Sequence, residues 1–460
     1  MTCRSARVSV LGAGVAGLTA GWHMANQGVA VQMFEQASRV GGMAVTLESD
    51  GYRFDLGPHR FYSHDPAMLD LVHGLLGDEL LLHHRSSQIR YNGRYLDYPP
   101  NVPSLLRNVD VATSVQCLYD YIRATWQRRA TRGDEPDFES WVVSRFGRRL
   151  YDMYFGPYTR KVWGLSPQLI SAEMARRRLT APNLTDVILR LMIPGKDSSS
   201  PYVTEFWYPR DGIGRIAERL AEEIVAGQGT IHLDSTVESV HVSGNRAVGV
   251  TVSQGDRQSY VPCDWVVSTL PLPVLIRRIV PAAGEAVRQA ADALSFRGLV
   301  FVFILVDGPQ LTHQHWLYFP EAQTLFNRLT EPCNFSLSHV PSGKTSLCAE
   351  ITCDVGDEIW QMPPEMLASQ TIQHLAGAGL LDPARVEGFF TRCTPWGYPI
   401  YRVGYEHDLD RVMEFLGGIE NLVTCGRQGS FDYSDMATAM ASGLAAAKSS
   451  LVSIGEGRDH

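Results

Sequence analysis

The feature that most constrains the fold is a glycine-rich turn close to the beginning of the chain. The turn Gly12-Ala13-Gly14-Val15-Ala16-Gly17 follows the apolar run Arg7–Leu11 and precedes a helical pattern that reaches about Asn26. A second apolar run, over 29–34, ends at Glu35. A strand, a G-x-G-x-x-G turn, a helix and a second strand that ends in an acidic residue are typical of a βαβ unit that binds a dinucleotide.

Each residue of this pattern has a physical role in holding a dinucleotide. Gly12 makes the tight turn, and Gly14 lets a pyrophosphate approach the backbone at the positive end of the helix. Gly17 allows the helix to pack closely on the strand, and Glu35 can accept hydrogen bonds from ribose hydroxyls. The pattern therefore predicts a complete nucleotide-binding turn.

A second pair of glycines, Gly41 and Gly42, follows Arg39 soon after this unit. Glycines so close to the ribose carboxylate offer a second place where the backbone can approach the diphosphate, which favours FAD over NAD. The chain has no second complete G-x-G-x-x-G turn and no CxxC pair, which argues against a dedicated NAD(P)H domain and against a disulfide reductase.

The rest of the chain alternates between helical and strand-like patterns. Residues 66–190 have a mostly helical pattern, whereas Leu299–Val306 is rich in β-branched and aromatic residues and predicts a central strand of a second sheet. A strand and a glycine turn over 421–429 precede a helical pattern over 436–452, so we expect the end of the chain to return to the first domain.

We predict an α/β fold in which a Rossmann-like, glutathione-reductase-type FAD-binding domain, made of three chain segments, is interleaved with an α+β substrate domain. The predicted bounds are 1–65, 206–275 and 406–460 for the FAD-binding domain, 66–205 for a helical cap and substrate region, and 276–405 for the sheet of the substrate domain.

Composition and charge argue against several other classes of protein. Lys and Arg number 41 against 49 Asp and Glu, a formal net charge of −8, with no long run of either sign, so we expect no nucleic-acid partner. The most apolar stretch is less than half as long as the ~20 residues of a spanning helix, and the chain begins without a signal-peptide pattern. We therefore expect a cytoplasmic protein without a transmembrane segment. His313 and His315 lack neighbouring ligands, so we predict no metal site.

Several motifs resemble one flavoprotein superfamily, which includes amine oxidases, protoporphyrinogen oxidase, carotenoid desaturases and UDP-galactopyranose mutase. Gly57-Pro58-His59-Arg60-Phe61 is similar to the mutase segment that sets a histidine beside the isoalloxazine ring. The segment from Tyr158 to Gly164 resembles the YTxKxWG stretch of that family, and the segment from Gly426 to Met436 reproduces its GR(x)5YxDM spacing. Arg177 and Arg328 resemble its substrate-binding arginines. The resemblance is closest to UDP-galactopyranose mutase-like proteins.

This resemblance implies a set of site residues. Arg177, Arg328 and Arg427 would neutralise a diphosphate, Tyr433 would donate a hydrogen bond to it, and Asp435 would accept one from a sugar hydroxyl. The residues expected to act in catalysis are His59, Arg328 and Asp435, and those expected to bind substrate are Tyr158, Trp163, Arg177, Arg328, Tyr433 and Asp435. The residues assigned to FAD are Gly12, Gly14, Ala16, Gly17, Glu35, Arg39, Gly41, Gly42, His59, Val237, Gly426, Arg427 and Met436.

The first functional hypothesis is a mutase-like flavoenzyme that acts on a nucleotide-linked or related anionic sugar in glycan or natural-product biosynthesis. The resemblance implies that reduced flavin acts as a nucleophile rather than as a net oxidant, with NAD(P)H as a candidate electron donor. The alternative is an FAD-dependent oxidase or dehydrogenase of the amine oxidase or protoporphyrinogen oxidase type, which the oxidase-like segments Phe206–Gly214 and Trp396–Tyr401 favour. A third hypothesis is a non-catalytic binding protein of the GDP-dissociation-inhibitor type, which could discard the glycines that this chain retains.

Overall fold

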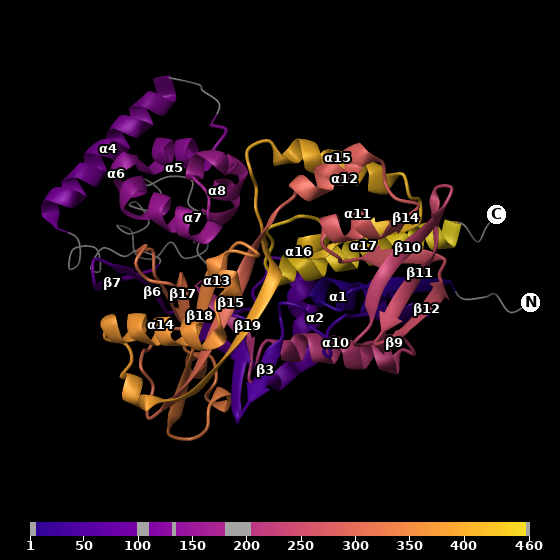
Figure 1. Cartoon of the computed structure of the whole chain (residues 1–460), viewed down its shortest axis with the longest axis horizontal. Coiled ribbons are helices and arrows are strands. Elements are labelled where there is room, and N and C mark those ends of the chain that lie inside the picture. The colour runs from indigo at the N-terminus through magenta and orange to yellow at the C-terminus, as the bar shows by residue number, and fades with distance from the viewer. Residues whose placement is uncertain (1–5, 99–109, 131–134, 180–203, 457–460) are drawn as a thin grey trace, which may run out of the picture.

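A five-stranded parallel sheet takes its strands from the beginning, the middle and the end of the chain (Figure 1). The computed structural model describes residues 6–98, 110–130, 135–179 and 204–456. The strand order is β20-β13-β1-β2-β9, with bounds Leu422–Thr424, Trp265–Ser268, Arg7–Leu11, Ala30–Phe34 and Thr230–His232. Every neighbouring pair is parallel. The sheet and the glycine turn after β1 confirm the Rossmann-like fold class.

Helices pack on this sheet and bring the two ends of the chain together, as Figure 1 shows at its right-hand side. These helices are α1 (Val15–Ala25), α2 (Pro66–Leu76), α10 (Gly214–Ala226) and α17 (Met436–Glu456). The contact between α1 and α17 is close at Gly443, where a Cβ atom would lie 2.0 Å from the carbonyl oxygen of Ala16. The helix from the end of the chain is therefore fitted against the helix that follows the first strand.

A four-stranded sheet of order β12-β11-β10-β14 belongs to the same part of the molecule. Its strands are Arg257–Pro262, Arg246–Gln254, Thr236–Ser243 and Ile279–Val280, and the neighbouring helices are α11 (Leu272–Arg278), α12 (Glu285–Ala293) and α15 (Tyr405–Gly417). β10 and β11 pair in an antiparallel manner, and Gly244 in the turn between them has a positive φ. The strand pair and its turn agree with the sequence pattern over 230–252.

The third large sheet has seven strands in the order β19-β15-β18-β17-β16-β6-β7. The strands are Val386–Pro399, Phe296–Asp307, Lys344–Cys353, Arg328–Thr330, Trp316–Tyr318, Ser87–Tyr91 and Arg94–Asp97, and the helices α13 (Glu358–Gln361) and α14 (Pro364–Gly377) belong to the same region. β15 is buried at every position except Asp307 and pairs with β18 on one side and β19 on the other. The prediction of a central strand at Leu299–Val306 is confirmed.

A group of helices lies above this sheet in Figure 1. They are α4 (Val111–Ala130), α5 (Phe138–Phe146), α6 (Arg148–Leu150), a π-helical turn (Tyr151–Phe155), α7 (Gly156–Trp163) and α8 (Ala172–Arg178). Predicted loops at Pro99-Pro100 and at 197–201 lie outside the described residues.

The expectation of a mostly helical pattern from residue 66 onward is wrong for residues 80–97. This stretch forms β5 (Leu80–His84), β6 and β7, and β5 pairs with β8 (Glu205–Pro209) while β6 pairs with β16. Both partners lie more than a hundred residues away in the sequence, so these hydrogen bonds of β5 and β6 leave no local signal. β7 pairs with β6 across a local turn at Asn92-Gly93, where both residues have positive φ. A two-stranded hairpin of β3 (Thr46–Ser49) and β4 (Tyr52–Asp55) completes the described strands.

Candidate active site

The glycine turn after β1 has a backbone that side chains would block. Gly12 has a φ of 97°, and a Cβ atom there would lie 2.3 Å from the Oγ1 of Thr269. A Cβ atom at Gly17 would lie 2.2 Å from the carbonyl oxygen of Gly12. Only glycine fits these positions, so the turn and the N-terminus of α1 can present bare backbone N–H groups to an anion.

The second glycine pair meets this turn from the following segment. Gly14 and Gly41 form an isolated parallel bridge, and a Cβ atom at Gly42 would lie 3.2 Å from the Cα of Gly14. Gly41 and Gly42 both have positive φ. Two stretches of backbone thus approach each other without an intervening side chain, which suits the diphosphate of a dinucleotide.

Glu35, directly after β2, is tied to the same turn. Its Oε2 accepts a 2.8 Å hydrogen bond from the amide of Ala13, and its Oε1 accepts a 2.9 Å bond from the amide of Ala37. A carboxylate oxygen can accept more than one hydrogen bond, so the side chain keeps capacity for ribose hydroxyls. Glu35 therefore stabilises the turn through these hydrogen bonds and also lines the candidate site.

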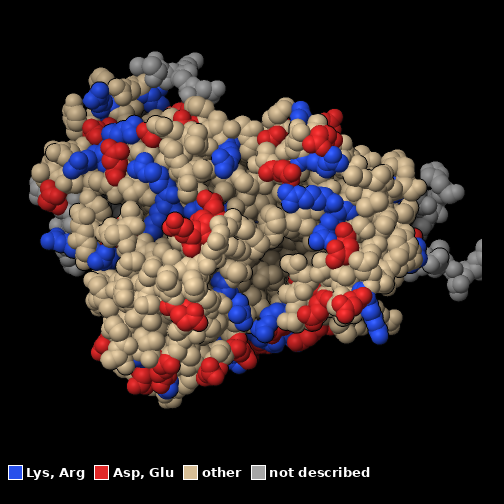
Figure 2. Space-filling model, viewed as in Figure 1, with Lys and Arg blue, Asp and Glu red and all other residues tan. Residues whose placement is uncertain are grey.

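These elements border a cofactor cleft of about 400 Å³. Figure 2 shows the surface hollowed between the part that carries β15 and β19 and the part that carries α10 and α11. Of the residues assigned to FAD, those in the lining of the cleft are Gly12, Gly14, Ala16, Glu35, Gly41, Gly42, His59, Val237, Gly426, Arg427 and Met436. The bare glycine backbone and the acidic residue in its lining fit FAD.

Two residues assigned to FAD lie outside this lining. Gly17 sits behind the turn, where it contacts Gly12. Arg39 is exposed, and its guanidinium lies 3.4 Å from the carbonyl oxygen of Thr46. Arg39 is not among the residues that line the cleft, so its assignment to FAD stays a prediction.

His59 lies between the cofactor cleft and the protein interior. The residue lines the cleft, while its Nδ1 is buried and has no hydrogen-bond partner among the described residues. Burial, together with the charges of Arg427 and Arg328, lowers the pKa of His59 to about 3. The imidazole is therefore neutral near pH 7 and acts there as a hydrogen-bonding and packing group.

A second cleft, of about 260 Å³, adjoins the first and is lined mainly by arginines and aromatic residues. We call it the arginine cleft. Its arginines are Arg60, Arg85, Arg177 and Arg178, and its tyrosines and tryptophan are Tyr62, Tyr98, Tyr154, Tyr158, Tyr318, Tyr433 and Trp163. Four of these, Tyr158, Trp163, Arg177 and Tyr433, are residues that the sequence predicts to bind substrate. Tyr62 in this cleft neighbours Asp435 in the cofactor cleft, and these two residues connect the clefts. Burial and the charge of Asp435 raise the pKa of Tyr62 to about 12.

Three of the four arginines form no ion pair with any carboxylate in the part of the chain that the structure describes. Arg60, Arg85 and Arg178 are stacked on aromatic rings instead, with guanidinium-to-ring distances of 4.8 to 5.7 Å. Burial and the charge of Arg85 lower the pKa of Arg60, and one terminal nitrogen of Arg60 is buried without a hydrogen-bond partner. An anionic ligand strongly stabilises buried arginines that have no carboxylate partner, because it supplies the missing negative charge and hydrogen-bond acceptors.

Two arginines predicted to neutralise a diphosphate are already paired. Arg177 forms a 2.9 Å ion pair with Glu173 and a second ion pair with Asp432. Arg328, on β17, pairs with the buried Glu350 on β18 and lies in the lining of neither cleft. Each of these two side chains has carboxylate partners within the protein, so their role in neutralising a diphosphate stays a prediction.

The start of α17 places two further predicted residues at the cofactor cleft. Asp435 accepts a 2.8 Å hydrogen bond from the amide of Thr438 and so caps the helix. Arg427 donates a 2.9 Å hydrogen bond to the carbonyl oxygen of Ser434 and lies 5.7 Å from the ring centre of Tyr433. Asp435 lines the cofactor cleft rather than the arginine cleft, so its role toward a sugar hydroxyl stays a prediction.

The sequence analysis missed Arg60, Arg85 and Arg178. Arg178 follows the assigned Arg177, and one residue along a helix rotates the side chain by about 100°, so both line the cleft but only Arg177 pairs with Glu173 and Asp432. Arg60 stands inside the recognised segment around His59. Arg85 lies between β5 and β6, whose placement depends on distant strands, and no local signal identifies it.

Among the residues that the structure describes, no three His, Cys, Asp or Glu side chains gather in a way that could hold a metal ion. Within the same ranges, no helix combines the length and the apolar character that crossing a bilayer requires.

The chain matches one known protein family. The model of the flavin containing amine oxidoreductase family matches residues 15–449, and the chain belongs to this family. It is therefore an FAD-dependent enzyme of an oxidoreductase family. The glycine turns and the cofactor cleft are the parts of the structure that we assign to the flavin. Membership in an enzyme family leaves the non-catalytic hypothesis without support.

Individual relatives differ in the reactions that their names describe. A 4,4'-diapolycopene oxygenase from Methylomonas sp. is 23% identical over 371 residues, which are 73% of this chain and 73% of that protein. A crystal structure of reduced UDP-galactopyranose mutase superimposes with a TM-score of 0.85 at 23% identity, over 97% of this chain and 94% of that one. A putative protoporphyrinogen oxidase from Exiguobacterium sp. 255-15 has a TM-score of 0.74 at 19% identity, over 97% and 98% of the two chains. At these identities the structural likeness shows the fold alone.

Proposed function

We propose that this flavoenzyme acts on a phosphate-bearing sugar, most simply a nucleotide-linked one, in a mutase-like reaction. The observation that carries the proposal is the set of three arginines, Arg60, Arg85 and Arg178, that line one cleft without carboxylate partners among the described residues. A diphosphate would supply the charge that these side chains lack. When bound, FAD supplies a ring system that can carry electrons and, in its reduced form, act as a nucleophile.

The protein groups divide the work between the two clefts. Arg178, held over the rings of Trp163 and Tyr433, would bind one end of the diphosphate, and Arg60 and Arg85 would complete the cation set. Phenolic hydroxyls in the lining would donate further hydrogen bonds to phosphate or sugar oxygens. His59 would pack, uncharged, against the cofactor, so that positive charge stays on the phosphate side of the site.

The alternative is an oxidase or desaturase that acts on an apolar substrate, which the carotenoid oxygenase relative favours. An apolar substrate in the arginine cleft would desolvate Arg60, Arg85 and Arg178 without giving them a partner, at a cost of several kcal/mol for each buried charge. This cost is our reason for ranking the anionic substrate first.

The first test is nucleotide binding to the FAD-loaded protein, oxidised and then reduced with dithionite without oxygen. UDP, GDP, dTDP and CDP are titrated in turn while flavin absorbance and fluorescence are recorded. We expect at least one nucleotide to perturb the flavin, with tighter binding to the reduced form. If none binds and a solubilised polyene bleaches the oxidised flavin, the oxidase alternative replaces the proposal.

A matched pair of variants isolates the arginine cleft. Arg178→Gln removes one stacked cation, whereas Arg176→Gln removes a charge on the same helix whose side chain is 52% exposed and lies 3.5 Å from Glu173. We expect Arg178→Gln to weaken nucleotide binding by roughly 10- to 100-fold, the effect of one charge-assisted contact, and Arg176→Gln to leave it unchanged. Equal affinities for the two variants would remove the support for a phosphate site.

NAD(P)H as the electron donor remains a prediction that the same preparation can test. Anaerobic addition of NADH or NADPH should bleach the flavin absorbance, with dithionite as the positive control. Failure of both nicotinamides would assign reduction to a separate reductase.

A further inference from the structure

The alternation of β17 brings Thr330 to the side of the sheet that faces the His59 segment. Arg328 and Thr330 are two residues apart on this strand and so point to the same face, whereas Leu329 between them belongs to the apolar core. On the paired strand β18, Glu350 stands opposite Arg328 and Cys348 stands opposite Thr330. A Cβ atom at Gly57 would lie 2.8 Å from Glu350, so this face packs against the segment that precedes His59.

A small internal cavity remains between that face and His59. Its volume is about 10 Å³, and its polar lining residues are Asp55, His59, Tyr208, Thr330, His339 and Cys348. A cavity of about this size holds one water molecule, provided that at least two polar atoms are available to bind it. His59 also lines the cofactor cleft, so the cavity lies directly behind a residue of the cofactor site.

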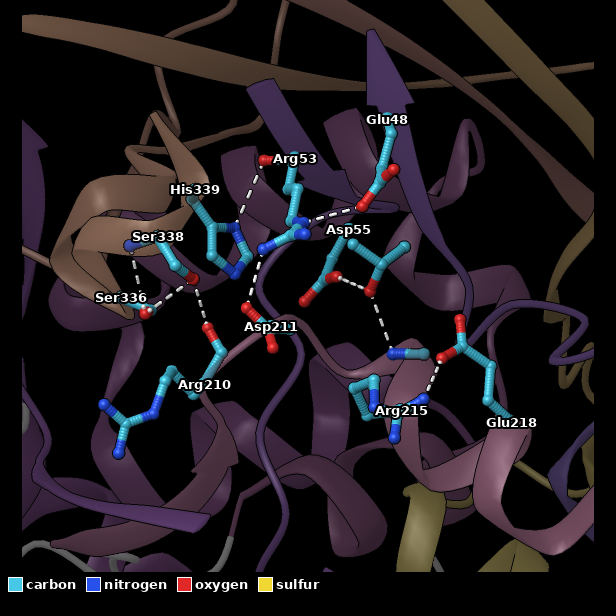
Figure 3. A network of polar contacts seen from close by, with 12 residues as sticks. Glu48, Arg53, Asp55, Arg210, Asp211, Arg215, Glu218, Ser336, Ser338 and His339 are labelled. Carbon is cyan, nitrogen blue, oxygen red and sulfur yellow. Dashed lines mark hydrogen bonds and ion pairs between the residues drawn. The ribbon is translucent and has the colours of Figure 1, made fainter. Parts of the chain in front are cut away.

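Most polar groups around the cavity already satisfy each other. The hydroxyl of Tyr208 donates a 2.6 Å hydrogen bond to Asp55 and lies 3.4 Å from the Nε2 of His339. The Nδ1 of His339 lies 3.2 Å from the carbonyl oxygen of Arg53. Figure 3 shows His339 at the carbonyl oxygen of Arg53, whose side chain pairs with Asp211, and Asp55 close by.

Two polar atoms of the lining residues remain unsatisfied. The Nδ1 of His59 and the Oγ1 of Thr330 are both buried and have no hydrogen-bond partner among the described residues. Thr330 itself is only 4% exposed. Buried polar atoms without partners are rare in proteins and usually mark an ordered water.

We propose that one buried water bridges the Nδ1 of His59 and the Oγ1 of Thr330, and that Thr330 is thereby a positioning residue for His59. The water holds one nitrogen of the imidazole from behind, which fixes the plane of the ring at the wall of the cofactor cleft. Thr330 contacts neither cleft and acts on the cofactor only through His59.

The test compares the FAD-loaded wild type with Thr330→Val and Thr330→Ser. Valine keeps the shape of threonine and removes the hydroxyl, whereas serine restores it. Thr391→Val on β19, which lies outside both clefts, controls for the loss of a hydroxyl in the same sheet. Each protein is crystallised with FAD at a resolution that shows ordered waters, and the flavin spectrum and midpoint potential are measured.

We expect the water in wild type and in Thr330→Ser, and its loss in Thr330→Val. We also expect Thr330→Val to shift the absorbance spectrum and the midpoint potential of the flavin. The anaerobic reduction of the flavin should slow by roughly tenfold, the effect of one well-placed hydrogen bond. Thr330→Ser and Thr391→Val should retain wild-type values. An empty cavity in the wild-type crystal, or a Thr330→Val protein with an unchanged spectrum and potential, would overturn the proposal. The wild-type crystal shows by itself whether the water is present, so the proposal can be overturned even if a variant fails to fold.

Discussion

Arg328 and Glu350 lie directly opposite each other on β17 and β18 and form an ion pair in which the carboxylate is only 2% exposed. The hydroxyl of Tyr398 lies 3.1 Å from both partners, where it accepts from the guanidinium and donates to the carboxylate. The pair stands behind Gly57, whose missing side chain leaves room for it. Arg328 thus packs, with Glu350, against the segment that leads to His59, and its role toward a ligand stays a prediction.

The first prediction concerns this ion pair. Arg328→Met should destabilise the protein by roughly 3–5 kcal/mol, because it leaves the buried charge of Glu350 without a partner. The double variant Arg328→Met/Glu350→Gln should recover much of that loss, and denaturant unfolding measures both. Arg277→Met, which breaks an exposed pair with Asp292, should cost less than about 1 kcal/mol. If Arg328→Met were as mild as this control, the pair would not stabilise the fold.

The second prediction concerns the glycine turn. Gly12→Ala should abolish retention of FAD during purification, because the new methyl group would meet the Oγ1 of Thr269 and the residue has a positive φ. The flavin-to-protein absorbance ratio measures this. Gly74→Ala in α2, where a Cβ atom meets nothing within 4 Å, should give a protein as yellow as wild type. A fully loaded Gly12→Ala protein would refute the assignment of the turn.

The third prediction is a pH dependence that comes from Asp55. Burial raises the pKa of Asp55 to about 6, against hydrogen bonds from Tyr208, Thr46 and the amide of Ile213 that lower it. A carboxyl whose pKa is raised by folding stabilises the protein below its unfolded pKa, near 4, and this contribution is lost as the pH rises to 6.

Asp55→Asn cannot ionise, so the advantage of wild type over this variant should fall by roughly 2 kcal/mol between pH 4 and pH 6. Denaturant unfolding of both proteins across this range gives the difference directly. Asp50→Asn, in the exposed turn between β3 and β4, serves as the control. A difference between wild type and Asp55→Asn that stays constant with pH would contradict the buried ionisation.

The fourth prediction concerns the contact between α1 and α17. Gly443→Ala should lower both stability and FAD retention, because its methyl group would lie 2.0 Å from the carbonyl oxygen of Ala16 and force the helices apart. Gly455→Ala in the same helix meets nothing within 4 Å and should be neutral or slightly stabilising. Thermal unfolding and flavin content separate the two variants, and equal behaviour would show that the close contact is dispensable.

The parts of the fold that the sequence predicted are those whose signals are local. The glycine turn, the strand ends at Leu11 and Phe34, and the buried strand β15 depend on residues within one short window. β5 and β6 depend on pairing with distant strands. β7 pairs with β6 across a turn at Asn92-Gly93, and this local hairpin signal was present in the sequence but was missed.

The residues of the candidate site also divide into those that local motifs predict and those that depend on the fold. The residues that line the cofactor cleft belong largely to motifs, because a dinucleotide imposes backbone constraints on short segments. Which arginines are free depends on which carboxylates the fold brings to them. Arg177 and Arg178 are neighbours in the chain, yet only Arg177 meets Glu173 and Asp432. That distinction exists only in three dimensions.

Because the parallel sheet combines strands from distant parts of the chain, the residues of the cofactor cleft are synthesised at different times. The glycine turn at Gly12 is synthesised long before Gly426 and Met436, which line the same cofactor cleft. A nascent chain that lacks β20 and α17 therefore has the nucleotide-binding fingerprint without the cleft. We therefore expect flavin capture to follow the synthesis of β20 and α17, and the chain to remain an unliganded folding intermediate until then.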